Sequence, residues 1–391
     1  MLFDADGMPV YYIDDDSQLA ELCGRLAEIS VIAMDTEFVR TNTFYSQLGL
    51  LQIGDGEACY LIDPQAIADW DPFRTLLNDA DKLFVLHSSS EDLSVLLTRL
   101  GCLPKNLFDT QLATAFLGEG FSLSYQALLE LLLEITVSKE ETRSDWLKRP
   151  LTDTQLHYAA LDVRYLHAVH AQLSERLAAA GKLDWFTADC TQQIQSAFLQ
   201  EDEAQWDSLF AAISNSWKLN DQGLSYLQAL TIWREREARR RDRPRSWIAK
   251  DNELQAIAYC LSKGKVDYSL SGLKEINDVP GKFIDRYGRE LLNLMSTASQ
   301  SGSQPDRILL NPPLEPAQRK QLKTCQQTAR AIAEKLQMAP ELLAKKKYLL
   351  NLLQRAESGA ELWHGEREDW RRALLESAIT PILISDPEHE A

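Results

Sequence analysis

Two acidic residues separated by one position, Asp35 and Glu37, are the first candidates for chemistry in this sequence. They follow the apolar run 31–34, which is rich in β-strand formers, and residues two apart in a strand project from the same face. Two carboxylates about 4 Å apart repel each other by roughly 4 kcal/mol at an effective dielectric constant near 20. Such a pair requires a bound cation or a bound proton, unless the strand has ended and both side chains are solvated in a loop.

A further candidate acid, Asp92, follows the strand-like run 83–86. Serines between them can begin a helix, and Ser88 with Glu91 matches the pattern of a capping box. Glu91 is then explained as an acid that complements a helix N-terminus. Asp92, in contrast, is predicted to point towards the surface that carries the first pair of acids.

A third element is a helix predicted to start just after Thr152, because Thr152 and Gln155 form a capping box. Tyr158 and Asp162 lie four residues apart and therefore share one face of this helix. The alternative is an ordinary half-buried tyrosine beside an exposed aspartate. His157, five residues before Asp162, is a competing partner for that acid.

Four carboxylates from two strand ends and a helix would form a site whose ligands are all oxygen atoms. Such a site suits Mg²⁺ or Mn²⁺ better than zinc, which prefers His and Cys. Two such ions in one site clamp the attacking and leaving oxygens of a phosphoryl displacement. The predicted chemistry is therefore metal-dependent phosphodiester hydrolysis.

Composition is consistent with a multidomain globular protein. The 391 residues are 45% hydrophobic and 25% charged, which predicts two or three ordinary domains. No apolar run approaches the length of a membrane span, and the start of the chain lacks a secretory signal pattern. Six widely spaced cysteines without a CxxC pair indicate neither a disulfide scaffold nor a zinc ribbon, and favour a cytoplasmic location.

Charge is distributed unevenly along the chain. The net charge is −17, and all of this excess lies in residues 1–190, because residues 191–391 contain equal numbers of acidic and basic residues. Short strand-like runs with an Asp55-Gly56 turn alternate with helical patterns in the first half, which predicts an α/β sandwich around a mixed sheet. The second half is helical in pattern, and a Ser/Gly/Pro-rich linker is predicted at residues 299–305.

The two helical segments are similar to each other at an offset of 95 residues. Trp247-Ile248-Ala249-Lys250 aligns with Leu342-Leu343-Ala344-Lys345, Leu254 with Leu349 and Ile257 with Leu352. Helical periodicity alone would align some of these apolar positions, so the pattern suggests an internal repeat without proving it.

Three ordered motifs in the first half resemble those of the ribonuclease D family, within the DEDD superfamily of 3′-to-5′ exonucleases. The motifs are Met34-Asp35-Thr36-Glu37-Phe38-Val39-Arg40, His87-x-x-x-Glu91-Asp92 and Tyr158-x-x-x-Asp162. The segment from Lys139 to Thr152 is also similar to the one that precedes the third motif. The helical half resembles tandem HRDC domains, which bind nucleic acids; the first copy carries Trp233-Arg234 and Arg286-Tyr287-Gly288, and the second lacks both.

This resemblance implies an α/β nuclease domain, with a ribonuclease H-like mixed sheet and flanking helices, followed by two all-α helical domains. The implied boundaries are 1–190 for the exonuclease domain, 205–297 for the first HRDC domain and 305–391 for a second, divergent HRDC-like domain. The implied partner is RNA, and neither a membrane nor an obligate protein partner is indicated.

The implied activity is that of a 3′-to-5′ exoribonuclease that removes terminal nucleotides from RNA, with tRNA precursors as the substrate class. Asp35, Glu37, Asp92 and Asp162 would hold two divalent metal ions, Mg²⁺ or Mn²⁺, and Tyr158 would orient the attacking water. The products would be nucleoside 5′-monophosphates. A 3′-to-5′ DNA exonuclease remains an alternative, since no identified residue reads a 2′-hydroxyl; a catalytically silent nucleic-acid-binding protein is less consistent with a full set of acids.

RNA contacts are predicted from a basic stretch in the first helical segment. Its candidate phosphate-binding residues are Arg239, Arg240, Arg241, Arg243 and Arg245. The alternative is a helix whose charges pair with one another at i,i+4 spacing. Phe38, with Gln52 and Phe44, is predicted to contact the terminal nucleotide, although core packing would also explain Phe38.

Overall fold

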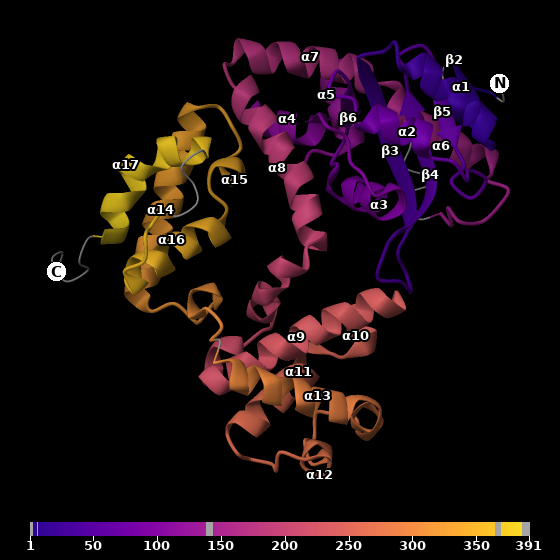
Figure 1. Ribbon diagram of the computed structural model, residues 1–391. Helices are drawn as coiled ribbons and strands as arrows, with labels where there is room; N and C mark the ends of the chain where they lie inside the picture. The colour runs from indigo at the N-terminus through magenta and orange to yellow at the C-terminus, as the bar shows by residue number, and fades with distance from the viewer. Residues whose placement is uncertain (1–2, 6, 138–143, 303, 364–368, 385–391) are drawn as a thin grey trace.

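The computed structural model describes residues 3–5, 7–137, 144–302, 304–363 and 369–384, so Lys139 lies outside the described residues. An α/β part, coloured indigo to magenta in Figure 1, is followed by the long helix α8 (Leu183–Glu201). Helix α8 leads to a first helical unit (residues 203–301). A second helical unit (residues 316–384) lies across α8 from the α/β part. None of the helices in the described part of the chain has the length and apolar character that a membrane crossing needs.

A mixed sheet forms the centre of the α/β part, and in the described residues it has seven strands in the order β1-β2-β5-β4-β3-β6-β7. Its strands are β1 (Phe3–Ala5), β2 (Met8–Ile13), β3 (Val31–Val39), β4 (Gln47–Gly54), β5 (Cys59–Ile62), β6 (Leu83–Leu86) and β7 (Leu107–Asp109). β4 and β5 form the hairpin that the Asp55-Gly56 turn predicted, whereas β3 pairs in parallel with β6. Three strands were not predicted: β1 and β7 are very short, and β2 contains a proline.

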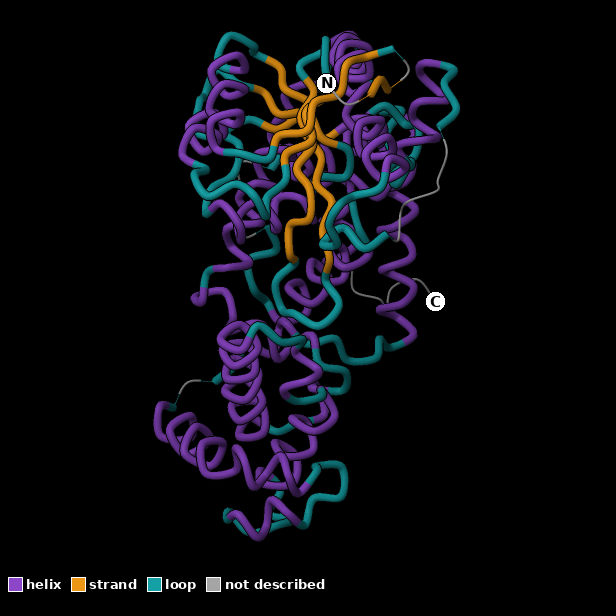
Figure 2. Tube along the Cα trace, turned by 90° about the vertical axis from the view of Figure 1, so that its right-hand side faces the viewer, coloured by secondary structure: helices purple, strands orange, loops and turns teal. Residues whose placement is uncertain are grey.

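Helices cover both faces of this sheet, which Figure 2 shows edge-on. They are α1 (Asp16–Leu26), α2 (Asp71–Leu77), α3 (Ser90–Leu100), α4 (Thr110–Phe116), α5 (Tyr125–Leu133), α6 (Asp153–Arg164) and α7 (Leu166–Ala179). α6 begins at the predicted capping box, in which the Thr152 side chain accepts from the Gln155 backbone N–H and the Gln155 side chain returns to Thr152. This fixed start determines which residues of α6 face the sheet.

The strand β3 does not end beside its acidic residues, which excludes the solvated-loop alternative. It runs five residues beyond Met34 to Val39, and Asp35 pairs with Gln52 of β4. Beyond the sheet the two strands continue towards the first helical unit, where residues 40–46 form the tip of their hairpin (Figure 2). The hairpin that carries the first motif therefore reaches across to the helical part of the protein.

The first helical unit packs around its own core, which includes Trp233 and Tyr287 with ring centres 5.0 Å apart. Its elements are η1 (Glu203–Ala212), η2 (Ser216–Lys218), α9 (Asp221–Arg241), α10 (Arg245–Ile248), α11 (Asp251–Ser262), α12 (Leu270–Lys274) and α13 (Gly281–Ser301). Because α13 extends to Ser301, the first residues of the predicted linker are helical. The predicted first boundary at residue 190 likewise falls inside α8.

The second helical unit repeats the pattern of the first. Its elements are the preceding turn η3 (Arg307–Leu309), α14 (Pro316–Lys335), α15 (Pro340–Leu343), α16 (Lys346–Ser358) and α17 (Trp370–Ile384). Helices α14, α15 and α16 each begin 95 residues after α9, α10 and α11, which supports the internal repeat at the predicted offset.

The second helical unit shares a continuous hydrophobic core with the α/β part. Trp370 stacks on Trp185 of α8 with ring centres 5.1 Å apart, and its ring centre lies 5.5 Å from that of Phe116 in α4. Arg371 forms an ion pair of 2.5 Å with Asp189, also on α8. This unit is therefore docked on the nuclease part through α8, and is not a loosely tethered appendage.

Candidate active site

Three of the candidate acids meet at one point of the sheet. β3 presents Asp35 and Glu37, and α6, which packs across β3, β4 and β5, presents Asp162. One carboxylate oxygen of each residue lies within 4.8 Å of the others. All three side chains are partly exposed, so a small ion can approach them from solvent.

Asp92 approaches the same place from the first turn of α3, which packs against β3 and β4. Its side chain is 6% exposed and accepts a hydrogen bond from the hydroxyl of Thr36, the residue between the first two acids. Although it lies outside the group of three, its negative charge raises the pKa of Asp35 and Glu37. The structure thus places all four predicted acids in one electrostatic cluster.

The four carboxyls are held in an environment that opposes their ionisation. Burial, followed by the charges of Asp92 and Asp162, raises the pKa of Asp35 well above its usual range. Burial and the neighbouring acids raise the pKa of Glu37 to about 9, and burial raises that of Asp92 to about 7. Burial and the charges of Glu37 and Asp92 also raise the pKa of Asp162. Among the described residues, no Lys or Arg is a main cause of these shifts, and each of the four pKa values is raised.

Tyr158 lies at this cluster and His157 does not. The hydroxyl of Tyr158 donates to the carboxylate of Asp162, and burial with the charge of Asp162 raises the pKa of this phenol. Tyr158 therefore stays protonated and can act as a hydrogen-bond donor at neutral pH. His157 is exposed on the other side of α6, which favours Tyr158 as the aromatic residue of the third motif.

The donor set fits a divalent cation. It consists of carboxylates, the ligand type that Mg²⁺ and Mn²⁺ prefer, and like charges this close require a compensating positive charge. A second observation is the side chain of Gln52, which is 0% exposed and whose amide nitrogen and oxygen have no hydrogen-bond partner among the described residues. Gln52 lies directly opposite Asp35 in the sheet and so faces the same side. A buried amide without partners at this position indicates that the site is complete only with further ligands or water.

The turn before Asp92 differs from the sequence-based expectation. Ser88 and Glu91 do not form a capping box: the N-cap of α3 is Ser89, which makes no side-chain cap hydrogen bond, and Ser88 has a left-handed backbone with φ 63°. The backbone N–H groups of this turn donate instead to the carboxylate of Asp109, at the end of β7. Asp109 is not among the residues predicted from the sequence. The signal was available, because Asp109 is another acid at the end of an apolar strand.

The predicted RNA-binding arginines are largely engaged within the protein. Arg240 and Arg241 pair with Glu237 at 2.7 and 2.6 Å, which is the i,i+3 and i,i+4 pairing considered as the alternative. Arg239 pairs with Glu235, and Arg245 pairs with the same carboxylate from across the turn. These pairings make Arg239, Arg240 and Arg241 weaker candidates for phosphate contact.

Arg239 also packs between two aromatic rings, one from the hairpin tip and one from η1. The guanidinium carbon of Arg239 lies 4.7 Å from the ring centre of Phe44 and 4.8 Å from that of Trp206. Phe44 is 7% exposed and belongs to the core of the first helical unit, so packing accounts for its ring. Phe38 is partly buried against the nuclease core, next to Glu37, and its contact with a nucleotide stays a prediction.

The raised pKa values predict how stability depends on pH and metal. A carboxyl whose pKa is higher in the folded protein binds an extra proton on folding, so its contribution is complete at low pH and is lost as pH rises through about 7 for Asp92 and about 9 for Glu37. We expect the melting temperature of the metal-free protein to fall between pH 5.5 and 9.5, and Mn²⁺ to reverse the fall. Differential scanning fluorimetry of wild type and Glu37→Gln checks this expectation. A wild-type curve that parallels the variant, with no response to Mn²⁺, would contradict it.

The fold and the site together define a class of protein. A central strand with two acids, flanked by helices that bring two further acids and a tyrosine to it, is the arrangement of the DEDD-type 3′-5′ exonucleases. Residues 10–178 match the family described as 3′-5′ exonuclease, and residues 224–295 match the HRDC domain. The protein is a nuclease of this class, and the fold implies dependence on divalent metal ions.

Relatives identify the family more closely. Ribonuclease D of Pseudomonas paraeruginosa is 38% identical over 96% of this chain and 98% of its own length, and that of Escherichia coli is 34% identical over 96% and 99%. The crystal structure of Escherichia coli RNase D, described as an exoribonuclease involved in structured RNA processing, superposes with a TM-score of 0.84 at 33% identity and covers 96% of this chain and 99% of that one. The chain therefore belongs to the ribonuclease D family, and the expected fold class is confirmed.

Proposed function

We propose that this protein is a 3′-to-5′ exoribonuclease that removes terminal nucleotides from RNA, with tRNA precursors as its substrate class, and releases nucleoside 5′-monophosphates. The observation that carries the proposal is the convergence of Asp35, Glu37 and Asp162 at β3, with Asp92 bonded to the intervening Thr36 and the Tyr158 hydroxyl bonded to Asp162. The RNA substrate is supported by the ribonuclease D relatives. The free thiols of all six cysteines support a cytoplasmic setting.

In this proposal the four carboxylates hold two divalent ions, Mg²⁺ or Mn²⁺. Such ions supply charge stabilisation for the transferring phosphoryl group and lower the pKa of water. The protein's own contribution is to hold these acids in place, through the hydrogen bond from Thr36 to Asp92 and the one from Tyr158 to Asp162. A protonated Tyr158 can also hydrogen-bond an attacking water and so fix its direction towards the terminal phosphodiester.

The RNA strand upstream of the 3′ end has a candidate binding surface where the hairpin tip meets the first helical unit. A hollow of about 560 Å³ lies here, and its lining includes four basic side chains and one acidic side chain. This excess of basic groups stands out in a protein with a net charge of −17. Its charged lining residues are Arg40, Arg234, Arg245, Lys250 and Asp251. We call this feature the basic hollow, and Arg40 places it three residues beyond Glu37.

Beside the basic hollow, Trp247 is 60% exposed, and the Arg243 guanidinium carbon lies 5.9 Å from its ring centre. Cations combined with an exposed aromatic ring suit single-stranded nucleic acid, whose bases stack on such rings. Of the predicted arginines, Arg243 and Arg245 are therefore the better candidates for RNA contact. Arg245 must then contact phosphate with the part of its side chain, 43% exposed, that Glu235 leaves free.

Removing a cation from the basic hollow should weaken RNA binding without regard to sequence. Arg40→Ala and Lys250→Ala are each expected to raise the Kd of a single-stranded RNA severalfold and to reduce the slope of log K against log salt by about 0.7–1, since one phosphate contact is lost. Fluorescence anisotropy across a salt series measures both quantities. Lys282→Ala, an exposed lysine elsewhere on the same unit, is the matched control. If the salt slopes of both variants equal that of Lys282→Ala, the basic hollow does not bind RNA phosphates.

The test of the proposed function is a side-by-side assay of tRNA with a 3′ extension, linear RNA and single-stranded DNA, each labelled at the 5′ end. With Mn²⁺ or Mg²⁺ we expect stepwise shortening of the RNA substrates and release of nucleoside 5′-monophosphates, and EDTA should stop both. Preferential shortening of DNA would indicate the DNA exonuclease alternative. Binding of RNA without any metal-dependent shortening would indicate a silent binding protein.

A further inference from the structure

The carboxylate of Asp109 accepts hydrogen bonds from the turn that precedes Asp92. Asp109 ends β7, next to β6 in the sheet, and is 2% exposed. Its Oδ1 accepts from the backbone N–H of Ser88 at 3.1 Å, and its Oδ2 accepts from the backbone N–H and the hydroxyl of Ser89, both at 2.9 Å. One buried side chain thus satisfies both N–H groups at the entrance to α3.

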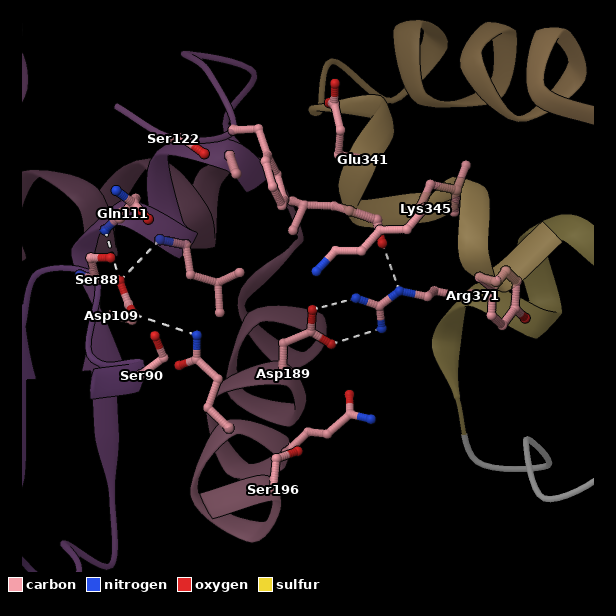
Figure 3. A pocket seen from close by; sticks show the side chains of 18 of the residues that line it. Ser88, Ser90, Asp109, Gln111, Ser122, Asp189, Ser196, Glu341, Lys345 and Arg371 are labelled. Atoms are coloured by element: carbon pink, nitrogen blue, oxygen red, sulfur yellow. Dashed lines mark hydrogen bonds and ion pairs between the residues drawn. The ribbon is translucent and has the colours of Figure 1, made fainter. Parts of the chain in front are cut away.

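The same carboxylate binds two further elements. Oδ1 is the N-cap acceptor of α4, for the backbone N–H groups of Gln111 at 2.9 Å and Leu112 at 3.1 Å. Oδ2 also accepts from the side-chain amide of Gln193 on α8 at 3.4 Å. Figure 3 shows Asp109 between Ser88 and the α8 side chains, at the edge of the pocket between the nuclease part and the second helical unit. The carboxylate therefore joins α3, α4 and α8.

The geometry of this turn determines where α3 begins. Ser88 adopts a left-handed backbone, which is uncommon for a residue other than glycine, and the helix has no side-chain cap of its own at Ser89. Asp92 lies in the first turn of α3, only three residues after Ser89, so a shift of the helix start moves its carboxylate directly. Asp109 supplies the hydrogen bonds that keep the turn in this conformation.

Two helix N-termini converge on the Asp109 carboxylate. The N-terminal ends of α3 and α4 both point N–H groups and the positive ends of their dipoles at it. An asparagine of the same shape would keep one acceptor oxygen and turn an NH₂ group towards N–H donors. Buried donors without acceptors are unfavourable, so the turn would rearrange to find water or other partners.

From these contacts we infer that Asp109 is a positioning residue for Asp92: it holds the start of α3 so that the Asp92 carboxylate stays at the Thr36 hydroxyl, beside the acid pair of β3. This inference rests on the proposed function, because Asp92 matters for catalysis only if it holds metal. Asp109 makes no hydrogen bond to the four acids in the described residues. Its hydrogen bonds hold the backbone of residues 88–89, and its charge is one of the causes, after burial, that raise the pKa of Asp92. Gln193 extends the same arrangement to α8, the helix that leads to the first helical unit.

The experiment compares Asp109→Asn with Asp15→Asn in the full chain. Asp15 is also an N-cap aspartate, accepting from the Gln18 backbone N–H at 2.9 Å, but it caps α1. For Asp109→Asn we expect kcat with RNA to fall 10- to 100-fold while KM stays within about threefold, and the Mn²⁺ concentration for half-maximal activity to rise about tenfold. Asp15→Asn should lose thermal stability with wild-type kcat and metal dependence.

A direct measurement of Mn²⁺ binding without RNA, by calorimetry or electron paramagnetic resonance, gives a readout that does not depend on turnover. It should show weaker binding for Asp109→Asn and unchanged binding for Asp15→Asn. If Asp109→Asn loses melting temperature but keeps wild-type kcat and Mn²⁺ affinity, Asp109 is only a structural cap and the inference is wrong.

If Asp109→Asn does not fold, Ser89→Ala and Gln193→Ala each remove one donor to Oδ2 and replace it in the test. Each should weaken Mn²⁺ binding two- to fivefold, and their combination should weaken it further; wild-type values in the folded double variant would overturn the inference. A wild-type protein without metal-dependent activity would instead overturn the proposed function, so the two failures are distinguishable.

Discussion

Asp162→Asn is expected to abolish metal-dependent shortening of RNA, with a fall in kcat of about 10³-fold or more. The substitution keeps the size of the side chain but removes a negative charge from the group of three acids at β3. Loss of roughly 4 kcal/mol of transition-state stabilisation, an ordinary contribution for a catalytic metal site, corresponds to a factor of about 10³. Initial rates with 5′-labelled RNA and Mn²⁺, measured under single-turnover conditions, test the expectation.

The same variant should bind RNA at least as well as wild type, because an acidic group near phosphates has been removed. In the absence of metal it should also melt at a higher temperature, since burial and repulsion from Glu37 and Asp92 oppose ionisation of Asp162. Mn²⁺ should then raise its melting temperature less than that of wild type. Asp153→Asn, in the exposed first turn of the same helix, is the matched control. A variant at Asp162 with near-wild-type kcat would exclude this acid from the metal site.

Local periodicity predicted much of this site correctly. Alternation along a strand places Asp35 and Glu37 on one face, and the capping box at Thr152 fixes the start of α6. With that start, four-residue spacing brings Tyr158 and Asp162 together. These relations extend over a few residues and follow from backbone geometry alone, so they can be read from the sequence without knowing the fold.

Contacts between distant segments could not be predicted in this way. The carboxylate of Asp242 accepts from the backbone N–H groups of Phe44 and Tyr45 at 2.9 and 3.0 Å, across 198 and 197 residues of chain. Nothing near Phe44 in the sequence indicates that its ring enters the core of a helical unit. The stacking of Trp370 on Trp185 is a contact of the same kind.

The turn at Ser88 shows how a local pattern can also mislead. Ser88 and Glu91 have the residue types and spacing of a capping box, yet the donors of this turn bind a carboxylate from the neighbouring strand. A buried carboxylate between two helix N-termini is a stronger acceptor than a serine hydroxyl, because charge-assisted hydrogen bonds are about twice as strong as neutral ones. The tertiary partner therefore determined the geometry, and the local motif did not.

The choice between Tyr158 and His157 gives the second large prediction. Tyr158→Phe is expected to lower kcat about 10²-fold with little change in KM, because it removes only the hydroxyl that donates to Asp162 and is available to orient a water. The ring, which packs 6.2 Å from that of Trp146, is kept, so the fold should be unaffected. His157→Ala is the control from the adjacent position; since His157 is exposed, we expect less than about a twofold change in kcat.

Steady-state kinetics at pH 6–9 distinguish the two variants. Because burial beside Asp162 raises the pKa of Tyr158, its hydroxyl stays protonated over this whole range and its contribution should not vary with pH. The ratio of wild-type to Tyr158→Phe activity should therefore be constant from pH 6 to 9. If His157 were the active residue, its substitution would give the large loss and Tyr158→Phe would give the small one. That outcome would assign the aromatic residue of the third motif to His157. The catalytic face of α6 would then differ from the face that carries Tyr158 and Asp162.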